Sequence, residues 1–525
     1  GGTVYDGSGG APFTGDVAVK GDRIAYVGPR APGRGREERD ARGLAVAPGF
    51  INMLSWSTES LLVDGRALSD LTQGVTLQVF GEGTSMGPLT PQMRAEELRT
   101  QGDLKYEIPW TTLGEYLEHL ERRGVAPNVA SLVGAATVRM NVLGEADVDP
   151  TPEQLDRMRG VVRQAMEEGA LGVGASLIYA PGAYAETDEL VALATEAGRC
   201  GGLYTVHMRS EGDRVLEAVD ETIEIARRSG APAEIYHLKL AGRSNWNKLD
   251  AVIGRIEAAR AQGLRITSDM YLYTAGATGL DAAMPTWVQA GGLQAWIDRL
   301  KDPATRARVL AEMRDPAPAW ENLMRHAGPE GTLLTEFKNE ALKPLTGKTL
   351  AEVARLRGKT PEETAIDLVI EDGSRVGVVY FLMSEDNVRR QIALPWMSFG
   401  SDAGARAPEG VFLRSSAHPR AYGNVARLLG RYVRDEGVIT LQEAVRRLTS
   451  LPAHNLGLSD RGRLADGFAA DVVVFDPAGV RDLATFERPH QLSEGVRDVV
   501  INGRFALKDG AATGAQALLL LAIVA

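Results

Sequence analysis

Two short apolar runs in the chain each end on a histidine. The first is Tyr204-Thr-Val-His207, and the second is Ile235-Tyr-His237. In a β/α barrel the residue at the C-terminal end of a strand points into the active-site mouth, so histidines from consecutive strands would lie side by side there. Because neutral imidazole is the commonest metal ligand in proteins, this pair predicts a metal site. The alternative for either histidine alone is a core or surface residue without a ligand.

A carboxylate follows a third apolar run. Residues Trp396–Phe399 lead into Gly400-Ser-Asp402, and at the end of a barrel strand Asp402 would face the same mouth. Hydrolysis by a metal-activated water needs a group that accepts and returns protons, which a carboxylate can do. The alternative role for Asp402 is to cap the N-terminus of a following helix.

Strand-like runs alternate with helical patterns across residues 49–455. Apolar residues recur at helical spacing in segments such as Pro152–Glu168 and Val215–Ser229. Alternation of this kind predicts a parallel sheet, and eight units predict a closed (β/α)8 TIM-like barrel of the α/β class. Residues 284–348, rich in Trp, Pro and charged residues, predict an insertion over the barrel mouth. The strand-like runs are Gly49–Leu54, Val75–Phe80, Asn128–Val133, Leu171–Ala175, Leu203–Val206, Glu234–Tyr236, Arg265–Ile266 and Trp396–Phe399.

Both ends of the chain are rich in β-forming residues. Asp16–Lys20 near the start and Ala470–Phe475 near the end read as strands bounded by turns. Because the termini of a domain often lie close together, we expect residues 1–48 and 456–525 to build one small β-sandwich beside the barrel.

Composition limits the possible partners. The 525 residues carry a formal net charge of −11, which argues against nucleic acid as the main partner because phosphate binding needs a basic face. The single cysteine, Cys200, excludes an intrachain disulfide and a cysteine-based structural zinc site.

Membrane insertion is not expected either. No apolar run reaches the roughly 18 residues that a membrane-spanning helix needs. The apolar tail Ala517–Ala525 is shorter than that, and its candidate roles are a strand or a segment docked on the core. The chain opens on Gly1-Gly2 without a signal peptide. We therefore expect a cytoplasmic protein, with an exported form whose signal peptide has been removed as the alternative.

The order of these parts resembles the amidohydrolase superfamily and, within it, the D-aminoacylases (N-acyl-D-amino-acid deacylases). The resemblance covers nearly the whole chain and implies metal-dependent hydrolysis of the amide bond of N-acyl-D-amino acids. It also implies that Asp402 is the general base that takes a proton from the metal-activated water and passes it to the leaving amine. The motifs that carry the resemblance are Ala47-Pro-Gly-Phe-Ile51, Gly169-Ala-Leu-Gly-Val-Gly174, His207-Met-Arg-Ser-Glu211, His237-Leu-Lys239, Asp269-Met-Tyr-Leu-Tyr273-Thr-Ala-Gly276, Gly400-Ser-Asp402 and His418-Pro-Arg420.

The chain departs from the family pattern at the metal ligands. The superfamily's first strand usually ends in His-x-His, but Leu54 and Trp56 stand at these positions and offer a metal no lone pair. Where D-aminoacylases commonly carry a cysteine after the second strand, Glu82 is the nearest ionisable group. A carboxylate also binds zinc, although Glu82 could instead cap its own loop. We predict one Zn²⁺ per chain, bound by Glu82, His207 and His237.

The substrate is expected to be a small molecule with a free carboxylate. The resemblance implies a carboxylate-recognising lysine after the second histidine, which is Lys239, with a carbamylated metal ligand or a surface lysine as alternatives. Tyr273 is a candidate for a further hydrogen bond to the carboxylate. Arg406 and Arg414, in the loop after Asp402, are further cationic candidates.

Two other functions compete with this prediction. A related hydrolase could act on a cyclic amide or a dipeptide. The loss of His-x-His also suits a catalytically silent barrel kept as a binding protein, although a silent site would have no use for Asp402.

Overall fold

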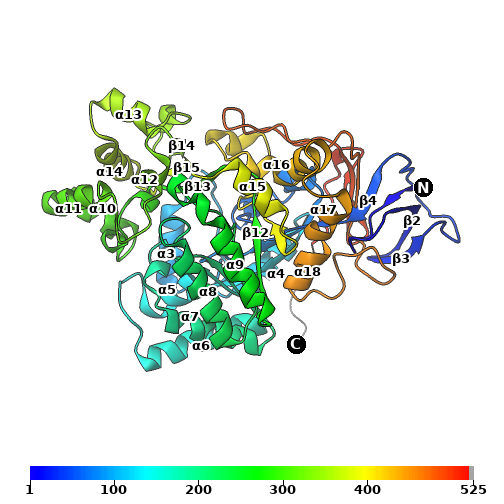
Figure 1. Cartoon of the computed structure of the whole chain (residues 1–525), viewed down its shortest axis with the longest axis horizontal. Helices are drawn as coiled ribbons and strands as arrows, with labels where there is room; N and C mark the ends of the chain where they lie inside the picture. Colours follow the sequence, from blue (N-terminus) through cyan, green and yellow to red (C-terminus); the bar gives the residue numbers. More distant parts are fainter. Residues whose placement is uncertain (519–525) are drawn as a thin grey trace.

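A closed barrel of parallel strands lies at the centre of the molecule (Figure 1). The computed structural model describes residues 1–518, and within them the barrel has the eight strands predicted from the sequence. The third of these is interrupted at Leu132, so that β7 continues into β8. The strands are β5 (Phe50–Asn52), β6 (Val75–Phe80), β7 (Asn128–Ser131) with β8 (Val133–Gly134), β9 (Gly172–Ser176), β10 (Leu203–His207), β11 (Ala233–Ile235), β12 (Ile266–Met270) and β16 (Met397–Phe399).

The barrel closes where the segments after its first and last strands meet. The amide of Asp402 donates to the carbonyl of Leu54 at 2.9 Å, and the amide of Trp56 donates to the carbonyl of Ala403 at 3.1 Å. Ser55 and Ala403 also form a parallel bridge. The loop after β5 and the loop after β16 are therefore held in one fixed register.

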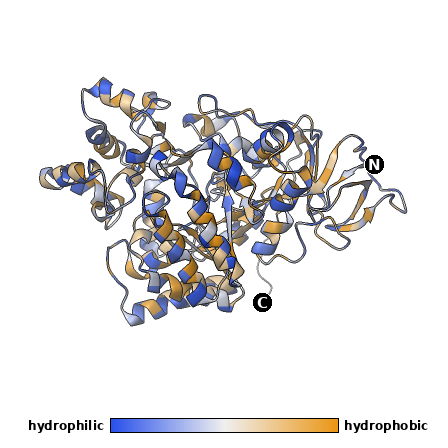
Figure 2. Cartoon of the chain, in the orientation of Figure 1, coloured by the Kyte–Doolittle hydropathy of each residue, from blue (hydrophilic) through white to orange (hydrophobic). Residues whose placement is uncertain are grey.

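Helices cover the outside of the barrel because their apolar residues form one stripe. In α8, for example, the buried residues recur at helical spacing and the remaining face is charged. Figure 2 shows this alternation of apolar and polar faces along the helices. The helices outside the excursion described next are α1 (Ser60–Val63), α2 (Leu68–Leu71), α3 (Pro91–Thr100), α4 (Leu113–Arg123), α5 (Ala135–Leu143), α6 (Pro152–Glu167), α7 (Thr187–Arg199), α8 (Val215–Ser229), α9 (Leu249–Ala261), α15 (Glu385–Ile392), α16 (Arg420–Arg427), α17 (Leu441–Leu448) and α18 (Ser450–Asn455).

A long excursion separates the last two barrel strands. It spans residues 271–384, up to the start of α15, so it is longer than the insertion expected at 284–348, and it has a hydrophobic core of its own. Figure 1 shows its helices at the end of the molecule opposite the N-terminus. Its antiparallel sheet has the order β13-β15-β14. The excursion contains β13 (Ala275–Gly279), α10 (Leu293–Lys301), α11 (Pro303–Met313), α12 (Leu323–Ala327), β14 (Thr332–Glu336), α13 (Leu350–Arg357), α14 (Pro361–Asp372) and β15 (Gly377–Phe381).

The two ends of the chain share one sheet, as the sequence predicts. Within residues 1–518 this sheet has eight strands in the order β20-β19-β18-β17-β4-β1-β2-β3, and β17 pairs with β4 to join the two ends. Of the apolar tail, Ala517 and Leu518 are buried against the core, and residues 519–525 lie outside the described part of the chain. The strands are β1 (Gly2–Val4), β2 (Phe13–Lys20), β3 (Arg23–Gly28), β4 (Ala45–Pro48), β17 (Val472–Phe475), β18 (Val496–Ile501), β19 (Arg504–Lys508) and β20 (Ala511–Ala512).

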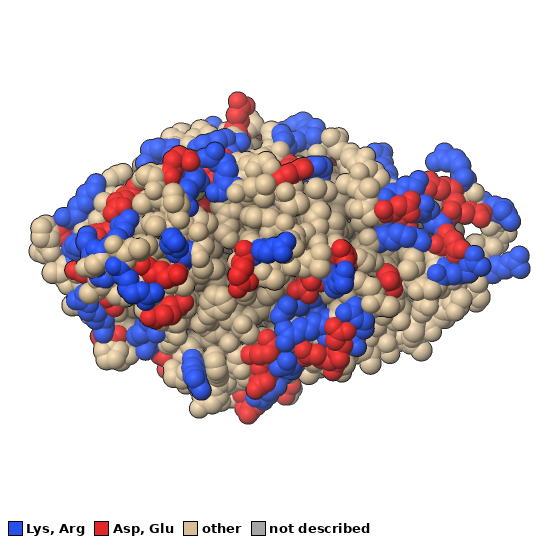
Figure 3. All heavy atoms as spheres, turned by 90° about the horizontal axis from the view of Figure 1, so that it is seen from above, with Lys and Arg blue, Asp and Glu red and all other residues tan. Residues whose placement is uncertain are grey.

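The surface carries charges of both signs. On the face shown in Figure 3, basic and acidic side chains are interspersed at both ends of the molecule and in a strip across its lower middle, with uncharged areas between these groups. Among residues 1–518, no helix combines the length and the apolar character that crossing a bilayer requires.

Candidate active site

The carboxyl ends of the barrel strands open into a cavity of about 780 Å³. Its lining comes both from the strand ends and from the excursion, which contributes residues such as Arg375 and Tyr380. In β/α barrels this end of the strands is where active sites are built. The charged and histidine side chains that line the cavity near the strand ends include Glu82, His207, Glu211, His237, Lys239, Asp402, Arg406, His418 and Arg420.

Glu82, His207 and His237, the three predicted metal ligands, lie together in the lining of this cavity. Glu82 follows β6, His207 ends β10, and His237 lies two residues after β11. The Oε1 atom of Glu82 lies 3.0 Å from Nδ1 of His207 and 2.8 Å from Nε2 of His237. All three residues are buried, and one ligand atom from each lies within 4.8 Å of the others. This cluster could hold a metal ion.

Glycines on both sides of Glu82 allow its loop to lie close to the neighbouring strands. Gly81 has a φ of +112°, and a Cβ atom there would lie 2.5 Å from the carbonyl oxygen of Leu132. Gly83 has a φ of +74°, and a Cβ atom there would lie 2.5 Å from the Cβ of Ser176. A side chain at either position would combine an unfavourable backbone conformation with a steric clash. The two glycines therefore let Glu82 enter the cavity.

The chemistry of the cluster fits a divalent cation. Two imidazoles and one carboxylate form a recurrent catalytic zinc set. Burial and the neighbouring Lys239 lower the pKa of His237, but the carboxylates of Glu82 and Glu211 outweigh them and raise it to about 10. The same negative surroundings would stabilise a bound metal. In addition, Nε2 of His207 is buried without a hydrogen-bond partner among residues 1–518, and the Glu211 carboxylate lies 3.6 Å from it.

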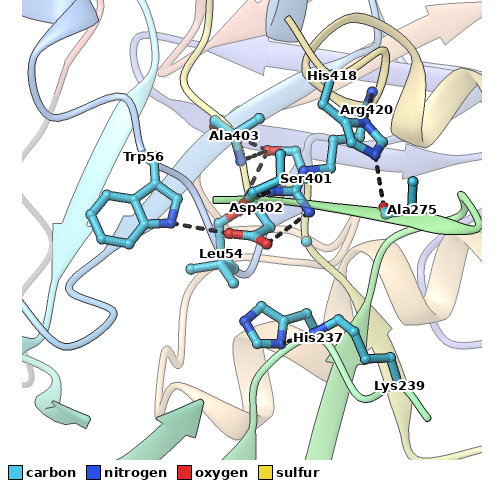
Figure 4. A network of polar contacts seen from close by, with 12 residues as sticks. Leu54, Trp56, His237, Lys239, Ala275, Ser401, Asp402, Ala403, His418 and Arg420 are labelled. Atoms are coloured by element: carbon cyan, nitrogen blue, oxygen red, sulfur yellow. Dashed lines mark hydrogen bonds and ion pairs between the residues drawn. The ribbon is translucent and has the colours of Figure 1, made fainter. Parts of the chain in front are cut away.

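Asp402 lies beside this cluster with its carboxylate between two donors. Its Oδ1 accepts from the indole Nε1 of Trp56 at 3.1 Å, and its Oδ2 lies 2.9 Å from Nη1 of Arg420 (Figure 4). Burial raises the pKa of Asp402, and the charge of Arg420 opposes this rise. The helix-cap alternative is ruled out, because the next helical segment begins only at Gly410.

Lys239 is buried beside His237. Its Nζ lies 2.6 Å from Oε1 of Glu211 and 2.7 Å from Nδ1 of His237, and it lies over the ring of Tyr271 at 5.5 Å. Figure 4 shows Lys239 and His237 on the side of the site that faces Asp402. The surface-lysine alternative is therefore wrong, because only 6% of the residue is exposed.

Of the other candidates for binding the substrate carboxylate, some line the cavity and others do not. Arg406 lines the cavity, whereas Arg414 lies outside it in an ion pair with Asp103 at 3.0 Å. Tyr271 lines the cavity, whereas the hydroxyl of Tyr273 is directed away from it and donates to Asp482 at 3.4 Å. The sequence analysis gave Tyr273 as the hydrogen-bonding candidate and Tyr271 as a packing residue, but β12 ends at Met270 and only Tyr271 of the two lines the cavity.

Two site residues were not assigned a role from the sequence. Arg420 holds Asp402, and the only sequence signal was its position in the motif His418-Pro-Arg420. Trp56 contacts both Asp402 and Glu82, although the sequence analysis treated it only as a lost metal ligand. The indole N–H is only a hydrogen-bond donor, so it suits a site rich in carboxylate acceptors.

The chain is similar to proteins of known family and structure. Residues 86–506 match the model of the amidohydrolase family. A D-aminoacylase from Alcaligenes xylosoxydans xylosoxydans is 33% identical over 98% of this chain and 95% of its own length. An N-acyl-D-glutamate deacylase from Bordetella bronchiseptica, solved with zinc and a phosphonate mimic of the tetrahedral intermediate, is 30% identical with a TM-score of 0.82 over 99% of this chain and 98% of its own. A D-aminoacylase structure, described by the one-metal activation and second-metal attenuation of its binuclear centre, is 32% identical with a TM-score of 0.81 over the same shares of both chains.

Replacing Glu82 should remove the metal. Glu82→Ala leaves two imidazoles, fewer than the three protein ligands typical of a catalytic zinc site. We expect the metal that remains after dialysis to fall to about a tenth or less of the wild-type content, because loss of even an outer-shell partner typically costs roughly 10–100-fold in metal affinity and Glu82 is a direct ligand. Elemental analysis of the purified protein measures this. Glu336→Ala is the matched control, because Glu336 is an exposed carboxylate that lines the same cavity. Wild-type metal content in Glu82→Ala would contradict the assignment.

Proposed function

Because the chain belongs to the amidohydrolase family, we propose that it hydrolyses the amide bond of N-acyl-D-amino acids, giving a carboxylate and a D-amino acid. The observation that carries this proposal is that Glu82, His207 and His237 lie in one cavity with Asp402. A metal site and a proton-accepting carboxylate side by side are the two requirements of hydrolysis by an activated water. The D configuration of the substrate rests on the relatives, which include D-aminoacylase and the N-acyl-D-glutamate and N-acyl-D-aspartate deacylases.

The cofactor in this proposal is one Zn²⁺ per chain, held by Glu82, His207 and His237. When bound, it would supply Lewis acidity for the amide carbonyl and lower the pKa of the attacking water. The choice of zinc is supported by the ligand set of two nitrogens and one carboxylate. The count of one is supported by Leu54 and Trp56, which stand where the family pattern has histidines.

Asp402 is the proton carrier in this proposal. Its carboxylate takes a proton from the attacking water while the new carbon–oxygen bond forms. It then delivers that proton to the amide nitrogen as the carbon–nitrogen bond breaks. Trp56 and Arg420 fix the orientation of Asp402 by contacting one carboxylate oxygen each. Fixed orientation matters because proton transfer requires the carboxylate to lie within hydrogen-bond reach of the oxygen of the attacking water and of the amide nitrogen.

In this proposal, cationic side chains in the cavity wall bind the free carboxylate of the substrate. Lys239 and Arg406 both line the cavity, and Tyr271 offers a hydroxyl where the sequence suggested Tyr273. The charge of Lys239 is shared with Glu211 in the structure, at 2.6 Å, so substrate binding would compete with this ion pair.

The first test of this function removes the proton carrier. Asp402→Asn keeps the size of the side chain and leaves the three metal ligands in place. We expect the metal content to stay unchanged and kcat to fall roughly 10²–10⁴-fold, the usual contribution of general acid–base catalysis. Release of free D-amino acid from N-acetyl-D-amino acids measures this. A metal-replete Asp402→Asn enzyme with near-normal turnover would remove Asp402 from the mechanism.

The second test concerns the carboxylate of the substrate. The methyl ester of a good N-acyl-D-amino acid should be a poor substrate, because it lacks the charge that Lys239 and Arg406 would bind. Lys239→Met should raise KM more than it lowers kcat, since the contact is made equally in the ground and transition states. Steady-state kinetics on acid and ester decide this. Equal rates on both would favour the alternative function, hydrolysis of a cyclic amide or another substrate without a carboxylate.

A further inference from the structure

The indole N–H of Trp56 contacts two carboxylates at once. Its Nε1 lies 2.9 Å from Oε2 of Glu82 and 3.1 Å from Oδ1 of Asp402. These carboxylates have different proposed roles, because Glu82 is a metal ligand and Asp402 is the proton carrier. Two neighbouring carboxylates repel each other unless a positive group or a donor lies between them. In this site the group between them is a neutral side chain.

The backbone fixes Trp56 in this position. Trp56 lies in the segment after β5, where Ser55 bridges to Ala403 and the amide of Trp56 donates to the carbonyl of Ala403 at 3.1 Å. The same pairing places the amide of Asp402 on the carbonyl of Leu54 at 2.9 Å. The backbone pairing that closes the barrel therefore also places the Trp56 ring beside Asp402.

Leu54 and Trp56 also stand at the two positions where the family pattern has His-x-His. Leu54 is fully buried and apolar, and Trp56 presents a donor where a metal ligand would need a lone pair. We propose that the Trp56 N–H takes the place of a second cation, so that this protein is restricted to one metal and Trp56 positions Glu82 and Asp402 relative to each other. This inference rests on the proposed function for the metal at Glu82 and for the role of Asp402.

The contacts divide the two oxygens of Glu82 between different partners. Oε1 faces His207 and His237, whereas Oε2 accepts from Trp56. Glu82 is therefore available to a metal through one oxygen, and its second oxygen is fixed by the indole. Groups that orient a metal ligand in this way typically change metal affinity or activity 10–100-fold when they are removed. Trp56 is thus a positioning residue with an effect on both metal binding and turnover.

The relevant variant is Trp56→Phe, which removes the N–H and keeps an aromatic ring. Trp287→Phe is the matched control, because Nε1 of Trp287 also donates to a carboxylate, that of Glu312, at 3.0 and 3.1 Å, and Trp287 does not line the cavity. Both proteins are freed of metal and titrated with ZnCl2, with zinc content and indole fluorescence as the readouts. Circular dichroism and thermal unfolding show whether each variant is folded.

We expect Trp56→Phe to bind zinc about 10–100-fold more weakly than wild type, with kcat reduced and KM little changed. Zinc should change the indole fluorescence of wild type and Trp287→Phe, and this change should be lost in Trp56→Phe. Unchanged zinc affinity in a folded Trp56→Phe protein would overturn the positioning role. Because zinc affinity is measured without substrate, this result is independent of whether N-acyl-D-amino acids are hydrolysed.

Restoring the family pattern tests the restriction to one metal. The double variant Leu54→His/Trp56→His should bind a second zinc, while wild type should retain only one after dialysis against the same zinc concentration. Elemental analysis gives both values. A wild-type protein that already retains two zinc ions would overturn the proposal. So would a folded double variant that still retains only one, because removal of Trp56 would then not have opened a second position.

Discussion

The site depends on one buried carboxylate and the donors around it. Glu82 is only 5% exposed, and its two oxygens lie 2.8 to 3.0 Å from nitrogens of His237, His207 and Trp56. A buried carboxylate without partners would be strongly destabilising, and removing one partner of such a pair typically costs roughly 3–5 kcal/mol. The three donors lie at or just after the ends of three different barrel strands. The barrel must therefore be closed and in register before Glu82 can be buried.

The rest of the site consists of charges that are balanced only as a group. Three carboxylates, those of Glu82, Glu211 and Asp402, face two buried cations, Lys239 and Arg420. The excess of negative charge accounts for the raised pKa of His237, and it would also favour a cation in the same place. Such a cluster does not stabilise a fold by itself. The apolar strands and helices supply the stability, and they hold the charged groups in positions that suit metal binding and proton transfer.

The sequence predicted the parts of the structure that depend on regular patterns. Alternating apolar runs located every barrel strand, and strand ends located His207, His237 and Asp402, because residue order and barrel geometry determine which side chains face the mouth. The prediction failed where the chain leaves that pattern. After β12 the chain is irregular, and there Tyr271 lines the cavity instead of the predicted Tyr273. The excursion also began before the expected residue. Contacts between residues far apart in the sequence, such as the hydrogen bond from Trp56 to Glu82, form only when the barrel closes. The spacing of residues along the chain does not predict them.

The most direct measurement is the rate of N-acyl-D-amino-acid hydrolysis as a function of zinc bound per chain. The metal-free protein would be given zinc in steps, and both bound metal and initial rate would be recorded at each step. A single site of three protein ligands predicts a rate that rises in proportion to bound zinc and reaches a plateau at about one equivalent. The account would be contradicted by a rate that rises until two equivalents are bound. It would also be contradicted by a zinc-loaded protein that hydrolyses none of these substrates.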